Sequence, residues 1–93
     1  MTDNQKSRVA CAEIRRVLLE VWDPIGVRGE PLAQDEYDSY IGSIYNLLVE
    51  EASEKEIIDY LYGVETEQMG LPEHDRKLLL PVVYALKKVI VSL

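Results

Sequence analysis

The chain has no phenylalanine, one cysteine and one histidine among its 93 residues. With Cys11 as the single cysteine, neither an intramolecular disulfide nor a zinc site built from a cysteine cluster can form. A nucleophilic thiol needs a histidine partner, and His74 lies in a polar segment far along the chain. We therefore expect Cys11 to be a small buried apolar residue.

Long apolar runs are also missing. The longest are residues 78–84, which include a proline, and residues 89–91. Both are far shorter than the roughly 18 residues that a membrane span needs. The N-terminal residues are polar, and no apolar core of a signal peptide follows them. We expect a cytoplasmic protein with no membrane association.

The common motifs of enzymes are absent as well. The sequence has no glycine-rich phosphate loop, no dinucleotide fingerprint, no paired-histidine zinc helix and no nucleophile elbow. Its serines have no histidine beside them in the sequence. These absences indicate a protein that is not an enzyme and that holds no cofactor or metal.

Negative charge is what the chain has in excess. The net charge is −7, and residues 23–75 carry fourteen acidic and two basic side chains, whereas residues 76–93 carry four basic side chains and none that are acidic. An acidic surface repels phosphate backbones, so we expect no nucleic-acid binding. The acidic middle either keeps a small protein soluble or attracts a basic protein partner.

Apolar residues recur at helical spacing in four segments. The first carries a stripe made of Cys11, Ile14, Leu18 and Val21. The last carries a wider stripe, which predicts a helix buried over much of its circumference; it consists of Leu78, Leu79, Val82, Val83, Tyr84, Leu86, Val89, Ile90 and Leu93. The sequence predicts an all-α, compact, four-helix bundle-like single domain over residues 1–93, with helices near residues 5–22, 35–51, 54–68 and 72–92.

Several residues mark the helix ends. Ser53 followed by Glu56 matches a reciprocal capping box, the strongest start signal in the chain. Gly70 suits the left-handed position after a helix, and Pro72 suits a first turn. Pro81 removes a hydrogen bond from the last helix, which we expect to be kinked or split there.

Polar and aromatic residues are densest around the first predicted connection. The candidate site residues there are Trp22, Asp23, Asp35, Glu36, Tyr37, Asp38 and Tyr40. In a structural interpretation, Trp22 fills the core, Asp23 binds loop amides, and Asp35 and Asp38 cap the second helix. Alternatively, the same surface binds a protein, because tyrosine and tryptophan are favoured contact residues. A third interpretation makes Asp23, Asp35, Glu36 and Asp38 a divalent-cation or acid–base site.

The chain also resembles a family of small bacterial helical domains of unknown function. The resemblance is carried by the W-D-P-I-G-V segment at residues 22–27 and the D-E-Y-D-x-Y segment at residues 35–40. A helix opening near Ser53 and a final helix containing Leu-Pro extend it over most of residues 14–93. It implies an α-helical fold and a bacterial source, and it carries over no catalytic residue.

Small acidic proteins of this kind are similar to immunity proteins encoded beside toxin genes. Acidic four-helix immunity proteins against nuclease bacteriocins match this chain in size and charge, although it lacks their paired-tyrosine-proline recognition motif. The leading hypothesis is therefore a non-enzymatic module that binds another, possibly basic, protein. An immunity protein that neutralises a basic toxin is one alternative, and a cation-dependent or enzymatic domain is the other. As for assembly, we expect a monomer or a weak homodimer through the last helix.

Overall fold

A computed structural model describes the backbone of residues 2–91 and the side chains of residues 5–90. Over these residues the protein is all-α, with no strand, which confirms the predicted fold class. The four α-helices are α1 (Thr2–Val17), α2 (Ile41–Val49), α3 (Glu54–Gly63) and α4 (Leu80–Val91). None of the helices in this part of the chain is long and apolar enough to cross a membrane.

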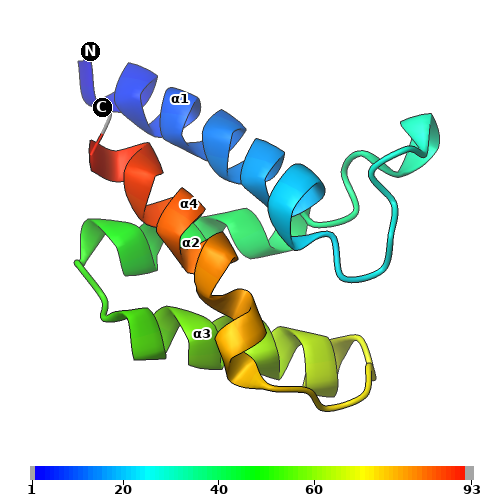
Figure 1. The fold of residues 1–93 in the computed structure, drawn as a ribbon. Coiled ribbons are helices and arrows are strands. Elements are labelled where there is room, and N and C mark those ends of the chain that lie inside the picture. The colour runs from blue at the N-terminus through cyan, green and yellow to red at the C-terminus, as the bar shows by residue number, and fades with distance from the viewer. Residues whose placement is uncertain (1, 92–93) are drawn as a thin grey trace.

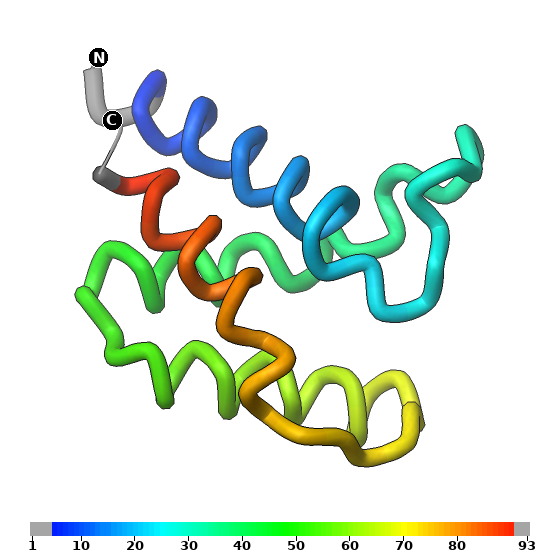
Figure 2. Tube along the Cα trace, in the orientation of Figure 1, coloured from blue at the N-terminus to red at the C-terminus, as the bar shows by residue number. Residues whose placement is uncertain are grey.

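The helices form a bundle in which α4 is the shared element. Figure 1 shows α1 along one side of the molecule and α3 along the other, with α4 crossing diagonally in front of α2. Consistent with this arrangement, α4 contacts each of the other three helices. The tube in Figure 2 shows the long connection between α1 and α2 looping away from the bundle at one end.

The hydrophobic core runs through all four helices. Its fully buried side chains include Ile14 from α1, Ile44 from α2, Leu61 from α3, and Val83 and Leu86 from α4. Cys11, which the sequence predicted to be buried, is only partly so.

Two helices end in a π turn, and each π turn changes which residue faces the core. The π turn Leu18–Trp22 extends α1, and the π turn Val64–Gln68 extends α3. A π turn closes its hydrogen bonds over five residues, as Asp23 N–H does on the Leu18 carbonyl at 2.8 Å. Because the turn takes up an extra residue, Trp22 is buried in place of Val21, which the sequence placed in the core stripe.

The predicted start and end of α3 are both confirmed. Ser53 accepts a hydrogen bond from the Glu56 N–H, and Glu56 accepts one from the Ser53 N–H, each at 3.1 Å. This reciprocal pair is the expected capping box. After the π turn, Gly70 adopts a φ of +67°, the left-handed conformation that ends the helix.

The second helix begins later than predicted. Instead of starting at Asp35, the chain makes the 3-10 turns Pro31–Ala33 and Asp38–Tyr40, and α2 follows at Ile41. Asp35 is therefore not the N-cap, and its carbonyl accepts a turn hydrogen bond from Asp38 N–H at 3.1 Å. The cause is Tyr37, which is buried against the core and holds this segment in turns.

The fourth helix also begins later than predicted. Residues 71–75 are not helical, so Pro72 is not in its first turn. Asp75 is the N-cap, because its carboxylate accepts a hydrogen bond from Lys77 N–H at 2.9 Å. The 3-10 turn Arg76–Leu79 then leads into α4, which places Pro81 in the first α-helical turn, where a missing N–H removes no helical bond. The predicted end at residue 92 lies outside the described residues.

Candidate functional site

Asp23 organises the connection that follows α1. It adopts a left-handed conformation with φ of 35°, and its carboxylate accepts hydrogen bonds from Val27 N–H at 2.7 Å, Arg28 N–H at 3.2 Å and the Tyr37 hydroxyl at 2.9 Å. The Tyr37 oxygen in turn accepts a hydrogen bond from Ile25 N–H at 3.2 Å. One carboxylate and one phenol therefore fix both ends of the W-D-P-I-G-V segment.

The protonation states of this pair are set by its surroundings. Burial alone would raise the pKa of Asp23, but the hydrogen bonds from Val27 N–H, the Tyr37 hydroxyl and Arg28 N–H outweigh it and lower the pKa below its usual value. Burial, together with the neighbouring Asp23 carboxylate, raises the pKa of Tyr37 to about 12. At neutral pH the pair is a carboxylate and a phenol, which suits an architectural role.

The structure disperses the predicted site. Trp22 and Tyr37 are buried and their rings lie 5.3 Å apart, so neither presents a contact surface. Tyr40 packs edge-on to Trp22 with ring centroids 6.3 Å apart and is partly exposed. Asp35 and Glu36 are exposed, and Asp38 forms an ion pair with Arg15 at 3.0 Å.

The interpretation of these acids as a metal site finds no support in this arrangement. Asp23 spends its carboxylate on backbone amides and a phenol, and Asp38 on a guanidinium. Among the described side chains, no three acidic, histidine or cysteine residues come close enough together to hold a metal ion. The structural interpretation of Trp22 and Asp23 is the one that the geometry supports.

A buried polar centre that the sequence did not reveal lies where the two π turns meet. Glu65 is only 5% exposed. Its Oε2 accepts a hydrogen bond from the Trp22 Nε1–H at 2.7 Å, and its Oε1 lies 2.5 Å from His74 Nε2. The other ring nitrogen of His74, Nδ1, lies 2.8 Å from the carbonyl of Asp75. This chain of contacts ties the end of α1 to the end of α3 and to the loop that leads into α4.

The His74 ring is held by acceptors on both sides, which favours its protonated form. A carbonyl accepts but cannot donate, so Nδ1 carries a hydrogen, and Nε2 shares a proton with the Glu65 carboxylate. The hydrogen bond to Glu65, followed by the one to the Asp75 carbonyl, raises the pKa of His74 above its usual value. The Tyr62 ring packs edge-on against the imidazole at 5.3 Å.

The His74 contact predicts that stability declines as pH rises from neutral. Below the ordinary histidine pKa of about 6.5, the ring is protonated in both the folded and unfolded chain, and its contribution is complete. That contribution is lost as pH rises through the raised pKa of the folded state, at about 1.4 kcal/mol for each pKa unit of the shift.

Urea unfolding at a series of pH values above 6 measures this slope, and NMR titration of the single histidine locates its pKa. The variant His74→Gln should remove the slope over the same pH range. A His74 that titrates at or below 6.5, or an unchanged slope in the variant, would contradict the prediction.

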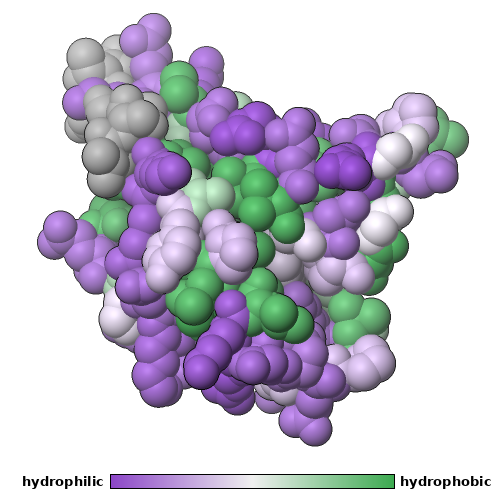
Figure 3. Space-filling model, viewed as in Figure 1, coloured by the Kyte–Doolittle hydropathy of each residue, from purple (hydrophilic) through white to green (hydrophobic). Residues whose placement is uncertain are grey.

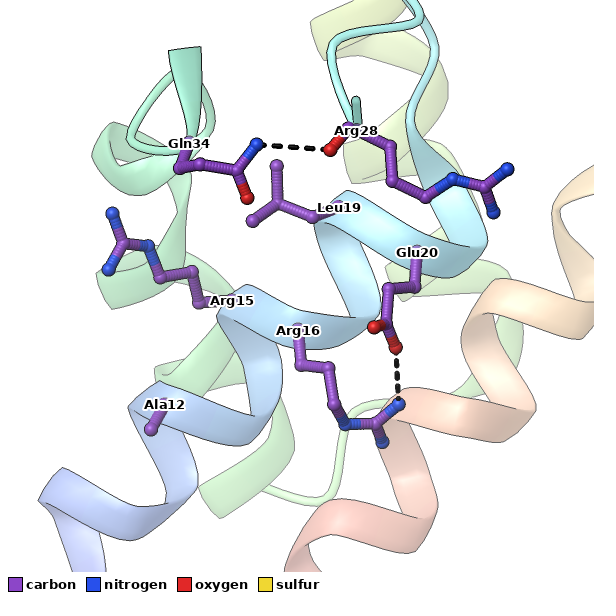
Figure 4. Close-up of a pocket in the computed structure, with 7 residues that line it drawn as sticks. All are labelled: Ala12, Arg15, Arg16, Leu19, Glu20, Arg28 and Gln34. Carbon is purple, nitrogen blue, oxygen red and sulfur yellow. Dashed lines mark hydrogen bonds and ion pairs between the residues drawn. The ribbon is translucent and has the colours of Figure 1, made fainter. Parts of the chain in front are cut away.

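A hollow on the outer side of α1 gathers arginines but does not form an anion site. Its volume is about 330 Å³, and its lining includes Arg15, Arg16, Arg28 and Gln34. Figure 4 shows the guanidinium groups of Arg15 and Arg28 pointing to opposite sides of the hollow, while Arg16 pairs with Glu20 at 3.0 Å. The Gln34 amide donates to the Arg28 carbonyl at 3.1 Å. The positive groups are therefore spread apart and partly neutralised.

The clearest candidate for a binding surface is an apolar face on α4 and the end of α1. Leu78 is 68% exposed, Tyr84 51% and Val21 41%. Pro81 is exposed as well, and Ala85 partly so. We call these five residues the α4 outer face. Figure 3 shows apolar side chains gathered in the middle of this side of the molecule with hydrophilic residues around them.

The α4 outer face includes a shallow groove between two helices. A hollow of about 410 Å³ is lined by Val21 from the end of α1 and by Pro81, Tyr84 and Ala85 from α4, with charged residues at its rim. The sequence placed Val21, Leu78 and Tyr84 in core stripes, so their exposure corrects those predictions. Isolated exposed apolar residues are common, but a group of them with a polar rim marks an interaction surface.

Comparison with known proteins does not identify the chain: no family model, no curated protein and no solved structure gives a significant match.

Proposed function

We propose that this protein is a non-enzymatic module that binds another protein through the α4 outer face. The observation that carries the proposal is the joint exposure of Leu78, Tyr84 and Val21 on one side of a bundle whose other large apolar residues mostly line one core. Removing such a surface from water is the main driving force of protein association. Tyrosine is also among the residues that contribute most to protein interfaces.

The buried polar centre supports a rigid scaffold for this face. The π turn Leu18–Trp22 carries Val21 outward and Trp22 inward, and Trp22 is fixed by Glu65. The same π turn packs against α4, which carries the rest of the face. The face is thus built on two helices whose relative position is set by buried contacts, which lowers the entropic cost of binding.

A double variant of the face tests the proposal. Leu78→Glu with Tyr84→Glu puts two charges on the α4 outer face, and we expect at least a tenfold loss of affinity for the natural partner. The matched control is Leu32→Glu, because Leu32 is 97% exposed and lies on the connection between α1 and α2. Both changes are at exposed positions, so the free energy of unfolding should change by about 0.5 kcal/mol or less per substitution.

The measurement is cross-linking and affinity capture from cells that express the chain naturally, with partners quantified by mass spectrometry. A partner captured by the wild type and by Leu32→Glu but lost from the double variant is the expected result. Capture of the same proteins by all three chains, or of none by the wild type, would refute the proposed function.

A further inference from the structure

We infer that the α4 outer face binds an amphipathic helix with acidic flanks, contributed by another protein. This inference rests on the proposed function and specifies the partner of the same surface. It follows from the shape of the groove and from the charges beside it.

The shape of the groove favours a helix. The described part of the chain has no strand, so it offers no free sheet edge to which an extended peptide could add. The groove instead runs between the end of α1 and α4, with Val21 on one wall and Pro81, Tyr84 and Ala85 on the other. Side-chain ridges of a third helix pack into a groove of this kind, and its apolar anchors recur every three or four residues.

The charges on α4 favour an acidic partner. Residues 76–93 carry four basic side chains and no acidic one, in a chain whose net charge is −7. Lys77 and Lys88 are exposed and lie in one helical row with Pro81 and Tyr84, because positions 77, 81, 84 and 88 are spaced by three or four residues. The apolar face therefore has a lysine at each end.

The α1 wall of the groove does not cancel this charge pattern. Its rim holds Arg16, which pairs with Glu13 at 3.2 Å and with Glu20 at 3.0 Å. The excess positive charge thus lies on α4, and glutamates beside the apolar stripe of a partner helix would meet it. Complementary charges of this kind mainly set specificity and the rate of encounter.

A second copy of this chain fits the face less well. A two-fold contact through the α4 outer face would place Lys77 and Lys88 of one molecule against the same lysine row of the other. Such like-charge contacts oppose association. A weak homodimer through α4 is therefore an outcome that the test must be able to detect.

Designed peptides test the inference directly. One peptide of about 18 residues, roughly 27 Å of helix, has leucines along one stripe and glutamates on both flanks. A second has the same stripe with lysines on the flanks. We expect the glutamate peptide to bind at least tenfold more tightly at low salt, with a preference that falls as salt rises. Backbone NMR shifts should place it against Val21, Leu78 and Tyr84.

A charge reversal on the protein provides the matched control. Lys77→Glu should reduce the preference for the glutamate peptide several-fold, whereas Lys55→Glu, the same change at an exposed position at the start of α3, should leave it unchanged. Equal binding of both peptides, no binding of either, or NMR shifts on another surface would overturn the inference.

Two further measurements separate other occupants. Tighter binding to vesicles of phosphatidylglycerol than to the glutamate peptide, or sedimentation showing a dimer that Leu78→Glu dissociates, would also overturn the inference. If neither peptide binds while the double variant still loses its cellular partner, the proposed function stands and only this description of the partner fails.

Discussion

Replacing Glu65 with alanine is expected to lower the free energy of unfolding by about 3 kcal/mol, the largest effect of any single polar substitution in the chain. Glu65 is buried and accepts hydrogen bonds from Trp22 Nε1–H and His74 Nε2. Without it, the buried indole N–H has no acceptor and the histidine loses its carboxylate. A 93-residue domain is stabilised by about 5–10 kcal/mol in total, so such a loss is a large fraction of its stability.

Urea unfolding followed by Trp22 fluorescence measures this loss, since Trp22 is the only tryptophan and contacts Glu65 itself. Glu67→Ala is the matched control: it is the same substitution on the same π turn, at an exposed position. It should change stability by about 0.5 kcal/mol or less. Glu65→Gln keeps an acceptor for the indole and should cost less than Glu65→Ala. Equal losses for Glu65→Ala and Glu67→Ala would show that the buried centre contributes no stability.

This centre could not be predicted from the sequence, and the reason is the π turns. With α-helical spacing from Leu61, Val64 is an inward position and Glu65 lies at its edge, so a carboxylate there reads as solvent-facing. In the structure both Val64 and Glu65 are buried, because the π turn widens the helix by one residue. The same shift buries Trp22. Each segment lacks the proline that usually announces an irregular helix, so its sequence gives no signal.

The parts that the sequence predicted well depend on short-range signals. The capping box at Ser53 and the left-handed Gly70 act within one turn of the helix that they bound, and both were predicted. The start of α2 was missed because it depends on Tyr37, whose hydroxyl bonds to Asp23 fourteen residues earlier. A contact across that distance overrides the good local cap that Asp35 would make.

The candidate site was predicted in part only. Trp22 and Asp23 have the core-filling and amide-binding roles that one interpretation gave them. The α4 outer face was missed because Leu78 and Tyr84 fit the apolar periodicity of α4, and periodicity alone cannot show that a helix has more apolar circumference than its neighbours cover. That uncovered remainder is the surface on which the proposed function rests.

Replacing Asp23 with alanine is also expected to cost about 3 kcal/mol, through two separable causes. The first is the loss of an acceptor for Val27 N–H, Arg28 N–H and the Tyr37 hydroxyl. The second is backbone strain, because Asp23 has a positive φ, which costs alanine about 1 kcal/mol relative to glycine. Asp23→Gly removes the acceptor without the strain, so the difference between Asp23→Ala and Asp23→Gly measures the strain alone.

Asp35→Ala is the control that distinguishes the two acids of this connection. As an N-cap, the role that the sequence suggested, Asp35 would contribute about 1 kcal/mol, whereas its exposed position in a turn predicts a change of about 0.5 kcal/mol or less. The Asp23 contribution should also depend on acid. Its pKa is lowered in the folded state, so its stabilisation is complete above its usual pKa of about 3.8 and is lost as pH falls through the folded value. Urea unfolding of wild type and Asp23→Ala should therefore converge at low pH, and a constant difference down to the most acidic condition would show that the Asp23 carboxylate is not what holds the W-D-P-I-G-V segment.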